Sequence, residues 1–189
     1  GGTLLWANSS GGSLDDWGLS NCTDAAGNVL VTGYFWSPTI SFGSNVLTNA
    51  GDYDMYVVKY DNAGNVLWVN AAAGSGLDYG NSITTDGVGN ALVTGAFTSG
   101  TMNFGTTVLT NAGDYDILVA KYDTSGNLLW AYSEGDYNLD YGTAITTDPA
   151  GNAIITGGFA SDSIMFGANV VVNTGSWDIF IAKLDIETG

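Results

Sequence analysis

Carboxylates are the most abundant reactive groups in this chain, and most other catalytic side chains are missing. The 189 residues include 19 Asp and Glu, three Lys, one Cys, no Arg and no His. A Ser–His–Asp triad, an imidazole metal site and a guanidinium clamp for phosphate are therefore excluded. Without a histidine, Cys22 is not a protease-type nucleophile. Among familiar mechanisms, only the paired carboxylates of a glycosidase remain formally available.

The spacing of the acids argues against catalysis as well. Most of them recur every 62 residues, in five sets: Asp16/Asp78/Asp140, Asp24/Asp86/Asp148, Asp52/Asp114, Asp54/Asp116/Asp178 and Asp61/Asp123/Asp185. An active site is normally single, so a carboxylate that occurs in each copy is expected to hold the repeat together. We therefore predict that the protein is not an enzyme.

The lysines follow the same spacing. All three cations, Lys59, Lys121 and Lys183, occupy one repeat position within an apolar stretch. A half-buried ammonium group needs a carboxylate partner. We expect structural ion pairs with Asp24, Asp86 and Asp148 or their sequence neighbours. The alternative is a ring of three lysines that binds an anion.

Net charge limits the partners. The formal charge of −16 repels the phosphates of nucleic acids and of anionic membranes. No apolar run approaches the roughly 18 residues that a membrane helix needs. We expect no nucleic-acid binding and no membrane insertion. Cations, neutral sugars and basic protein surfaces remain as candidate partners.

Calcium is the one cofactor that the sequence leaves open. Asp-x-x-Gly-Asn segments such as Asp24–Asn28 are rich in oxygen ligands. They lack the alternating ligand series ending in Glu that an EF-hand loop requires. An aspartate that caps a tight turn explains them more simply. Glu134 and Asp136 share one loop and could bind a cation, although a solvated acidic loop explains them as well.

Aromatic residues near loops are candidates for sugar binding. Trp36 has no aromatic counterpart in the other copies, whereas Trp17 aligns with Tyr79 and Tyr141. Trp177 aligns with Tyr53 and Tyr115. Such rings stack well on a sugar, but packing between repeats explains them too and is the reading we favour.

The elements that position these residues come in three copies. In the middle copy, β-branched and alternating segments predict strands at 82–86, 91–97, 116–122 and 128–132, with a small hairpin within 101–111. No segment has a helical period. The sequence predicts an all-β protein of three 62-residue repeats, each a propeller-like four-stranded sheet plus an extra hairpin. We align Cys22 with Ile83 and Ile145 and expect it to be a small, buried, apolar residue.

The chain resembles the SBBP family of β-propeller-related repeats. The resemblance rests on segments such as 23–35, which contains Asp-Ala-Ala-Gly-Asn-Val-Leu-Val-Thr-Gly-Tyr-Phe, and 57–68, which ends in Gly-Asn-Val-Leu-Trp. It spans all three copies. It implies a four-stranded blade and an extracellular setting in a secreted or surface protein of bacteria, and it implies no reaction.

The ends suggest how the repeats close. We expect one repeat domain, 1–189, with repeats at approximately 11–72, 73–134 and 135–189 and an N-terminal strand, 1–10, that completes the C-terminal repeat. Three blades are fewer than propellers usually need. We therefore expect self-association into a six-bladed ring, an array or a fibre. The alternatives are a self-closed monomer and a segment cut from a longer array of repeats.

These inferences favour a non-enzymatic extracellular module, a structural or adhesive unit of a bacterial surface or secreted assembly. The alternative is a carbohydrate- or calcium-binding module that uses Trp17, Trp36, Tyr79 and Tyr141 or the acidic loops.

Overall fold

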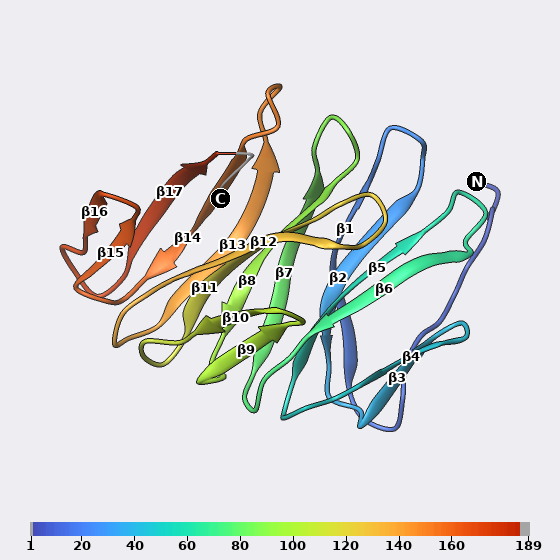
Figure 1. The fold of residues 1–189 in the computed structure, drawn as a ribbon, viewed down its shortest axis with the longest axis horizontal. Helices are drawn as coiled ribbons and strands as arrows, with labels where there is room; N and C mark the ends of the chain where they lie inside the picture. Colours follow the sequence, from blue (N-terminus) through green and yellow to red (C-terminus); the bar gives the residue numbers. More distant parts are fainter. Residues whose placement is uncertain (1, 186–189) are drawn as a thin grey trace.

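The protein is all-β. The computed structural model describes residues 2–185, which contain 17 strands and no helix. The strands form three larger antiparallel sheets, which follow one another from right to left in Figure 1, and three small hairpins. The three-copy architecture predicted from the 62-residue period is therefore present. Because residues 2–185 contain no helix, none of their segments is a helix that could cross a membrane.

The first two copies contribute a four-stranded sheet and a hairpin, and the third contributes a three-stranded sheet and a hairpin. The first sheet has the order β1-β2-β5-β6, from β1 (Asp16–Thr23), β2 (Val29–Phe35), β5 (Asp54–Tyr60) and β6 (Val66–Ala72). The second has the order β7-β8-β11-β12, from β7 (Asp78–Thr85), β8 (Ala91–Phe97), β11 (Asp116–Tyr122) and β12 (Leu128–Glu134). The third has the order β13-β14-β17, from β13 (Asp140–Thr147), β14 (Ala153–Phe159) and β17 (Asp178–Leu184). The hairpins are β3 (Thr39–Phe42) with β4 (Asn45–Thr48), β9 (Thr101–Phe104) with β10 (Thr107–Thr110), and β15 (Ser163–Phe166) with β16 (Asn169–Val172).

The first strand of each sheet is longer than its β-branched segment predicts. In β7 the strand starts at Asp78, although Asp-Tyr-Gly-Asn is a turn-like composition, and its pairing with β8 shifts between Gly80 and Ser82. The shift is a bulge, which admits an extra residue into a strand. A Cβ on Gly80 would lie 2.1 Å from Thr32 Oγ1 of the first sheet, so only glycine fits there. The close approach of two sheets explains this glycine.

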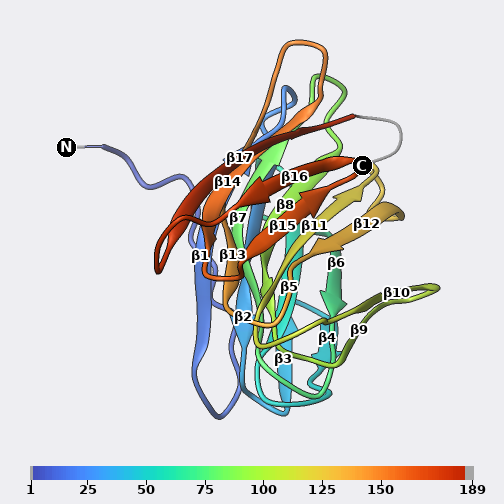
Figure 2. The ribbon, with the colours of Figure 1, turned by 90° about the vertical axis from the view of Figure 1, so that its left-hand side faces the viewer.

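The core has two layers between successive sheets and a third cluster, which includes Phe42 and Tyr56, on the outer side of the first sheet. One layer combines Met55 and Val57 of β5 with Ile83 of β7 and Val93 of β8. The next layer combines Ile117 and Val119 of β11 with residues of the third sheet. Neighbouring sheets thus bury their facing sides against each other, as in a repeat protein, and the second sheet does so on both sides. Figure 2 looks along the stack, so that the three sheets lie one behind another, and it shows the N-terminal segment leading away from them.

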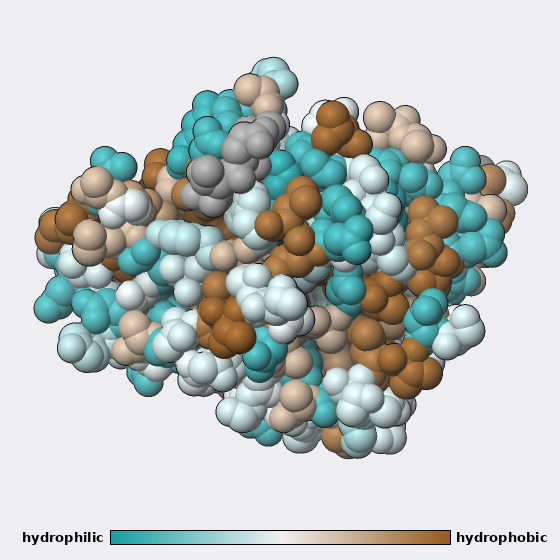
Figure 3. Space-filling view, in the orientation of Figure 1, coloured by the Kyte–Doolittle hydropathy of each residue, from teal (hydrophilic) through white to brown (hydrophobic). Residues whose placement is uncertain are grey.

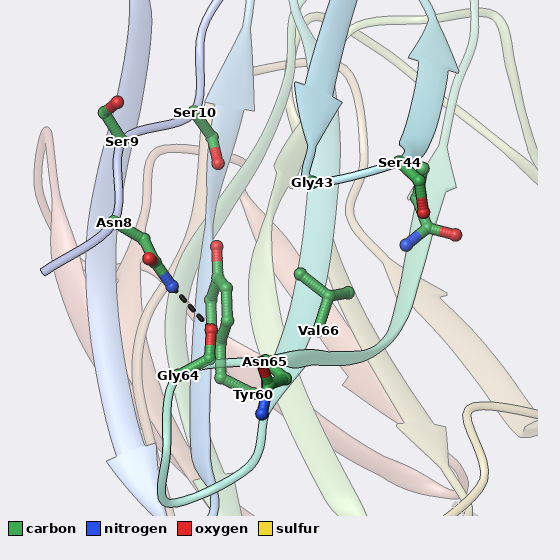
Figure 4. A pocket seen from close by; sticks show the side chains of 10 residues that line it. Asn8, Ser9, Ser10, Gly43, Ser44, Tyr60, Gly64, Asn65 and Val66 are labelled. Carbon is green, nitrogen blue, oxygen red and sulfur yellow. Dashed lines mark hydrogen bonds between the residues drawn. The ribbon is translucent and has the colours of Figure 1, made fainter. Parts of the chain in front are cut away.

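The N-terminal segment lies on the outer side of the first sheet. The rings of Trp6 and Tyr60 are 5.9 Å apart, and Asn8 Nδ2 donates a hydrogen bond of 2.6 Å to the carbonyl of Gly64. Figure 4 shows Asn8 pointing toward Gly64, beside a cavity of about 350 Å³ that Ser10 and Val66 also line. The segment contacts the first sheet, at the opposite end of the stack from the third (Figure 1).

Two sequence expectations need correction here. Within residues 2–185 the third sheet has three strands, and residues 2–10 do not complete it in the same chain. The cause is the order of the stack, which places two sheets between the N-terminal segment and β17. The alignment of Cys22 is also wrong by one residue, because Cys22 pairs with Leu30 as Thr84 pairs with Leu92. Its half-buried side chain therefore faces the second sheet.

Candidate functional site

The Asp-x-x-Gly-Asn turns are built around their aspartates. Asp24 Oδ1 accepts hydrogen bonds of 3.0 Å from the backbone N–H groups of Ala26 and Asn28, and Oδ2 accepts one of 2.8 Å from the Asn28 side chain. Gly27 has φ of 80°, which closes the turn. The same pattern recurs at Asp61, Asp86, Asp123 and Asp148. These oxygens are occupied by the protein's own donors, as expected for turn capping.

Each lysine reaches one of these turns. Lys59 Nζ lies 2.9 Å from Asp24 Oδ2, Lys121 Nζ lies 3.2 Å from Asp86 Oδ2, and Lys183 pairs with Asp148. These are the partners that the sequence suggests. Lys59 and Lys121 have side chains only 3% exposed, whereas that of Lys183 is 55% exposed. The first two pairs are sealed between sheets and the third is open.

The ion pairs change the acidity of the carboxyl groups. Burial raises the pKa of Asp24, but hydrogen bonds from Lys59 and Asn28 outweigh it and lower the pKa to about 2. At Asp86 burial again opposes hydrogen bonds from Asn90 and Lys121, and the net pKa is lowered. Hydrogen bonds from Lys183 and Asn152 also lower the pKa of Asp148. All three carboxyl groups are therefore ionised at neutral pH.

A second kind of carboxylate lies at the junctions between sheets. Asp54 and Asp78, at the starts of β5 and β7, are both fully buried. Burial raises the pKa of Asp54 to about 6. Burial also raises the pKa of Asp78 to about 7, against a hydrogen bond from Ser99 and with the help of the charge of Asp54.

These junction acids are fixed by backbone and hydroxyl donors. Asp54 Oδ2 accepts a 2.6 Å bond from the N–H of Ala50, and Asp78 Oδ2 accepts a 2.8 Å bond from the Ser99 hydroxyl. Asp116 and Asp140 repeat the arrangement between the second and third sheets. Such groups can hold protons near neutral pH, but their duplication and enclosure point to a role in the junction.

An aromatic ladder runs along the stack of sheets. We use this name for seven rings in successive contact, with neighbouring centroids 4.8–6.2 Å apart: Trp36, Tyr53, Tyr34, Tyr79, Tyr115, Tyr141 and Trp177. Its tyrosines are half-buried, while both terminal tryptophans are exposed. Rings at this spacing stabilise one another by stacked and edge-to-face contacts. The ladder therefore links the three sheets.

The sugar-binding candidates separate into two groups. Trp36, Tyr79 and Tyr141 belong to the ladder, whereas Trp17 is exposed and outside it. A pocket of about 230 Å³ lies beside Trp36 and is lined by Asp52, Tyr53 and Leu77. It is the place where an exposed ring of the ladder borders a hollow.

The acidic loop does not gather metal ligands. Glu134 accepts a 2.6 Å hydrogen bond from Tyr132 Oη and a 2.9 Å bond from the N–H of Met165. Asp136 accepts a bond from the N–H of Tyr137. In residues 2–185 no three His, Cys, Asp or Glu side chains come together as a metal site would require. Glu134 instead ties β12 to the hairpin β15–β16.

Sequence reasoning missed two features whose signals were present. The sequence aligned Tyr53 and Tyr115 with Trp177. It did not predict that the rings of Tyr53 and Tyr115 would contact those of Tyr79 and Tyr141. The 62-residue spacing also marked Asp54 and Asp78 as scaffold residues without showing that they meet across a junction. Which repeat positions face each other depends on how the sheets stack, and the period alone does not specify this.

Comparison with known proteins agrees with a repeat of the propeller kind. A stretch of 133 residues is 29% identical to an uncharacterized WD repeat-containing protein, L264, of Acanthamoeba polyphaga mimivirus. The match covers 64% of this chain and 10% of the relative, so the chain spans only a small part of that protein. No family model matches the chain.

Proposed function

We propose that this protein is a non-enzymatic structural module of an extracellular assembly, built from propeller-like repeats of the SBBP kind and acting through contacts between its sheets. One observation carries the proposal: the repeated polar groups serve the scaffold. The lysines pair with turn aspartates, and the turn aspartates accept backbone N–H bonds. The scaffold alone therefore accounts for these side chains.

The charge of the module suits this role. A net charge of −16 keeps separate copies apart at low salt and lets them approach when salt screens the repulsion. The extracellular bacterial setting rests on the resemblance of the repeats to the SBBP family. The similarity to a WD repeat-containing protein supports a scaffold in the same way and assigns no reaction.

Electron microscopy of the purified protein in 150 mM salt tests the proposal. Rings, arrays or fibres of regular spacing are the expected result. Dispersed particles at every concentration, together with a reproducible ligand, would contradict a structural role and favour a binding module.

A second candidate function is carbohydrate binding, with or without calcium. The pocket beside Trp36 favours it, because an exposed indole, a tyrosine and a carboxylate face one hollow. A glycan array with and without Ca²⁺ tests this candidate. Binding of one sugar class that Trp36→Ala abolishes and Trp17→Ala preserves would establish the pocket as the site.

A further inference from the structure

The third sheet leaves open a face that the other two sheets bury. Met55 and Val57 of β5 and Ile117 and Val119 of β11 are fully buried. The equivalent residues of β17, Ile179 and Ile181, are 84% and 75% exposed. Lys183 is likewise more exposed than its equivalents: its side chain is 55% exposed, whereas those of Lys59 and Lys121 are 3% exposed. The open face is therefore defined by Ile179, Ile181 and Lys183, and its residue types are those of a buried junction.

The internal junctions show what covers such a face. A Cβ on Gly80 of β7 would meet Met55 Cγ at 3.3 Å, and a Cβ on Gly142 of β13 would meet Ile117 Cγ2 at the same distance. At both junctions, therefore, a glycine of the next sheet packs against the residue at the repeat position of Ile179. The first sheet carries the equivalent glycine, Gly18, whose nearest neighbours are its own Tyr56 and Val31.

The N-terminal segment occupies the place of a fourth strand in a preceding sheet. In β6, Trp68 lies 6.1 Å from Tyr122 of the next sheet, and Asn70 Nδ2 donates to the Gly126 carbonyl over 2.7 Å. Trp6 and Asn8 make the same two contacts with Tyr60 and Gly64, 62 residues earlier, at 5.9 and 2.6 Å. The segment is placed as β6 is, but residues 2–185 form no sheet on this side of the first one to which it would belong.

Among the described residues, the third sheet has no counterpart of the fourth strand that this segment resembles. In the first and second sheets, β6 and β12 pair with the outer edges of β5 and β11. Within residues 2–185, β17 pairs with β14 only. An exposed strand edge offers unpaired N–H and carbonyl groups to another chain. Val170 and Val172 of the neighbouring β16 are also exposed, and Figure 3 shows apolar side chains among polar ones at this left-hand end of the molecule.

We propose that the open face of the third sheet binds the first sheet of a second copy of this chain, and that residues 4–10 of that copy pair with β17 as its missing fourth strand. This inference rests on the proposed structural function and specifies its interface. The contact is head to tail, so repeated use gives a closed ring or a fibre.

The internal sheets fix the register of the new strand. Met55 pairs with Ala72 and Val57 with Asn70, and Ile117 and Val119 pair with Glu134 and Tyr132 in the same register. Transferred by the repeat, these pairs place Ile179 opposite Ser10, Ile181 opposite Asn8 and Lys183 opposite Trp6 of the second copy. The pairing is antiparallel, like that of β5 with β6.

The new junction keeps some internal contacts and loses others. At the internal junctions, the hydroxyl groups of Thr32 and Thr94 lie against the glycines of the next sheet, Gly80 and Gly142. Thr156 occupies the same repeat position in the third sheet, so it can contact Gly18 of the second copy in the same way. Ser20 and Ser82 accept hydrogen bonds from the next sheet, but Ala144 stands at their position in the third sheet. We therefore expect the intermolecular junction to be weaker than the internal ones.

Disulfide trapping tests the register. In a Cys22→Thr background, chosen because Thr84 and Thr146 hold the equivalent positions, one chain carries Ser10→Cys and another carries Ile179→Cys. Mixed in 150 mM salt and oxidised with diamide, they are expected to give cross-linked dimers at least tenfold above a control in which Val88→Cys replaces Ile179→Cys. A chain with both Ser10→Cys and Ile179→Cys should give a ladder of oligomers or a closed dimer.

A charge in the open face tests the same contact without cross-linking. Ile181→Asp is expected to weaken assembly at least tenfold in light scattering, because a carboxylate would be buried opposite Asn8. Val88→Asp, at a site of similar exposure on a turn, should assemble as the unchanged chain does. Melting temperatures near that of the parent would show that both variants fold.

The outcomes separate this inference from the proposed function. Rings or fibres that form without the Ser10–Ile179 cross-link, and that persist in Ile181→Asp, would overturn the strand pairing and leave a structural role standing. A 19.5 kDa particle at all concentrations would overturn both. Cross-linking of Ser10→Cys chains with one another would indicate a symmetric contact and contradict the head-to-tail interface.

Discussion

Lys121 and Asp86 form an ion pair of 3.2 Å in which each side chain is only 3% exposed. The pair lies where the second sheet meets the third. Lys183 and Asp148 form the equivalent pair in the third sheet, where no further sheet of residues 2–185 covers them and the lysine side chain is 55% exposed. The same two residue types thus occupy a buried and an open setting within one molecule.

Removing a lysine should therefore have different effects in the two settings. Lys121→Met leaves a buried carboxylate without its cation and is expected to lower the free energy of unfolding by about 3–5 kcal/mol. Lys183→Met breaks an exposed pair and should cost no more than about 1 kcal/mol. Urea denaturation of the dilute monomer measures both. Equal losses would show that burial does not control the strength of the pair.

Stability should fall as pH rises toward neutrality. Burial raises the pKa of Asp78 from 3.8 to about 7 and that of Asp54 from 3.8 to about 6. An acid with a raised pKa contributes its full stability below its unfolded pKa and loses it as pH rises through the folded pKa. Between pH 4 and 7 the junction should weaken as these two groups ionise. Thermal melts across this range measure the effect.

A matched pair of variants isolates the contribution of Asp78 to this pH dependence. Asp78→Asn cannot ionise, so its melting temperature should depend less on pH and should exceed that of the parent at pH 8. Asp52→Asn changes an exposed acid and should keep the parent's pH profile. The attribution to Asp78 fails if both variants follow the same curve.

The turn glycines should differ in what they tolerate. Gly126 has φ of 89°, and a Cβ there would lie 2.8 Å from Trp68 Cδ2. Gly126→Ala should add backbone strain of about 1 kcal/mol and also displace the indole. Gly105, at φ of 76°, has open space around its Cβ position, so Gly105→Ala should show only the strain. Unfolding curves measure the backbone strain, and tryptophan fluorescence measures the displacement of the indole. An unshifted emission spectrum in Gly126→Ala would contradict the displacement.

The aromatic ladder should contribute to the junction between the second and third sheets. Tyr115 contacts Tyr79 at 6.2 Å and Tyr141 at 4.8 Å between ring centroids. Tyr115→Leu keeps an apolar side chain and removes two ring contacts, each worth about 0.5–1.5 kcal/mol beyond the buried area. Tyr137→Leu changes a ring that is mostly exposed and serves as the control. No difference in unfolding free energy between the two variants would show that the ladder is not stabilising.

The sequence allowed much of the fold to be predicted because the repeat multiplies each local signal. The turns at Asp24 and Asp86 could be expected from the chemistry of Asp, Gly and Asn alone. The lysine partners followed from the cost of burying an ammonium group. The start of β7 was missed, because a bulge hides strand residues within a turn-like composition. The place of residues 2–10 was also missed, since local pattern does not report which sheet lies next to which.

The open third sheet has a consequence for how the molecule comes apart. In a stack where each sheet contacts only its neighbours, local stability is set by how many neighbours a sheet has. The second sheet is held from both sides, and the third from one. The amide protons of β17 should therefore exchange with solvent faster than those of β11, although the two strands have nearly the same sequence. Loss of structure would begin at this end of the stack and proceed sheet by sheet toward the middle.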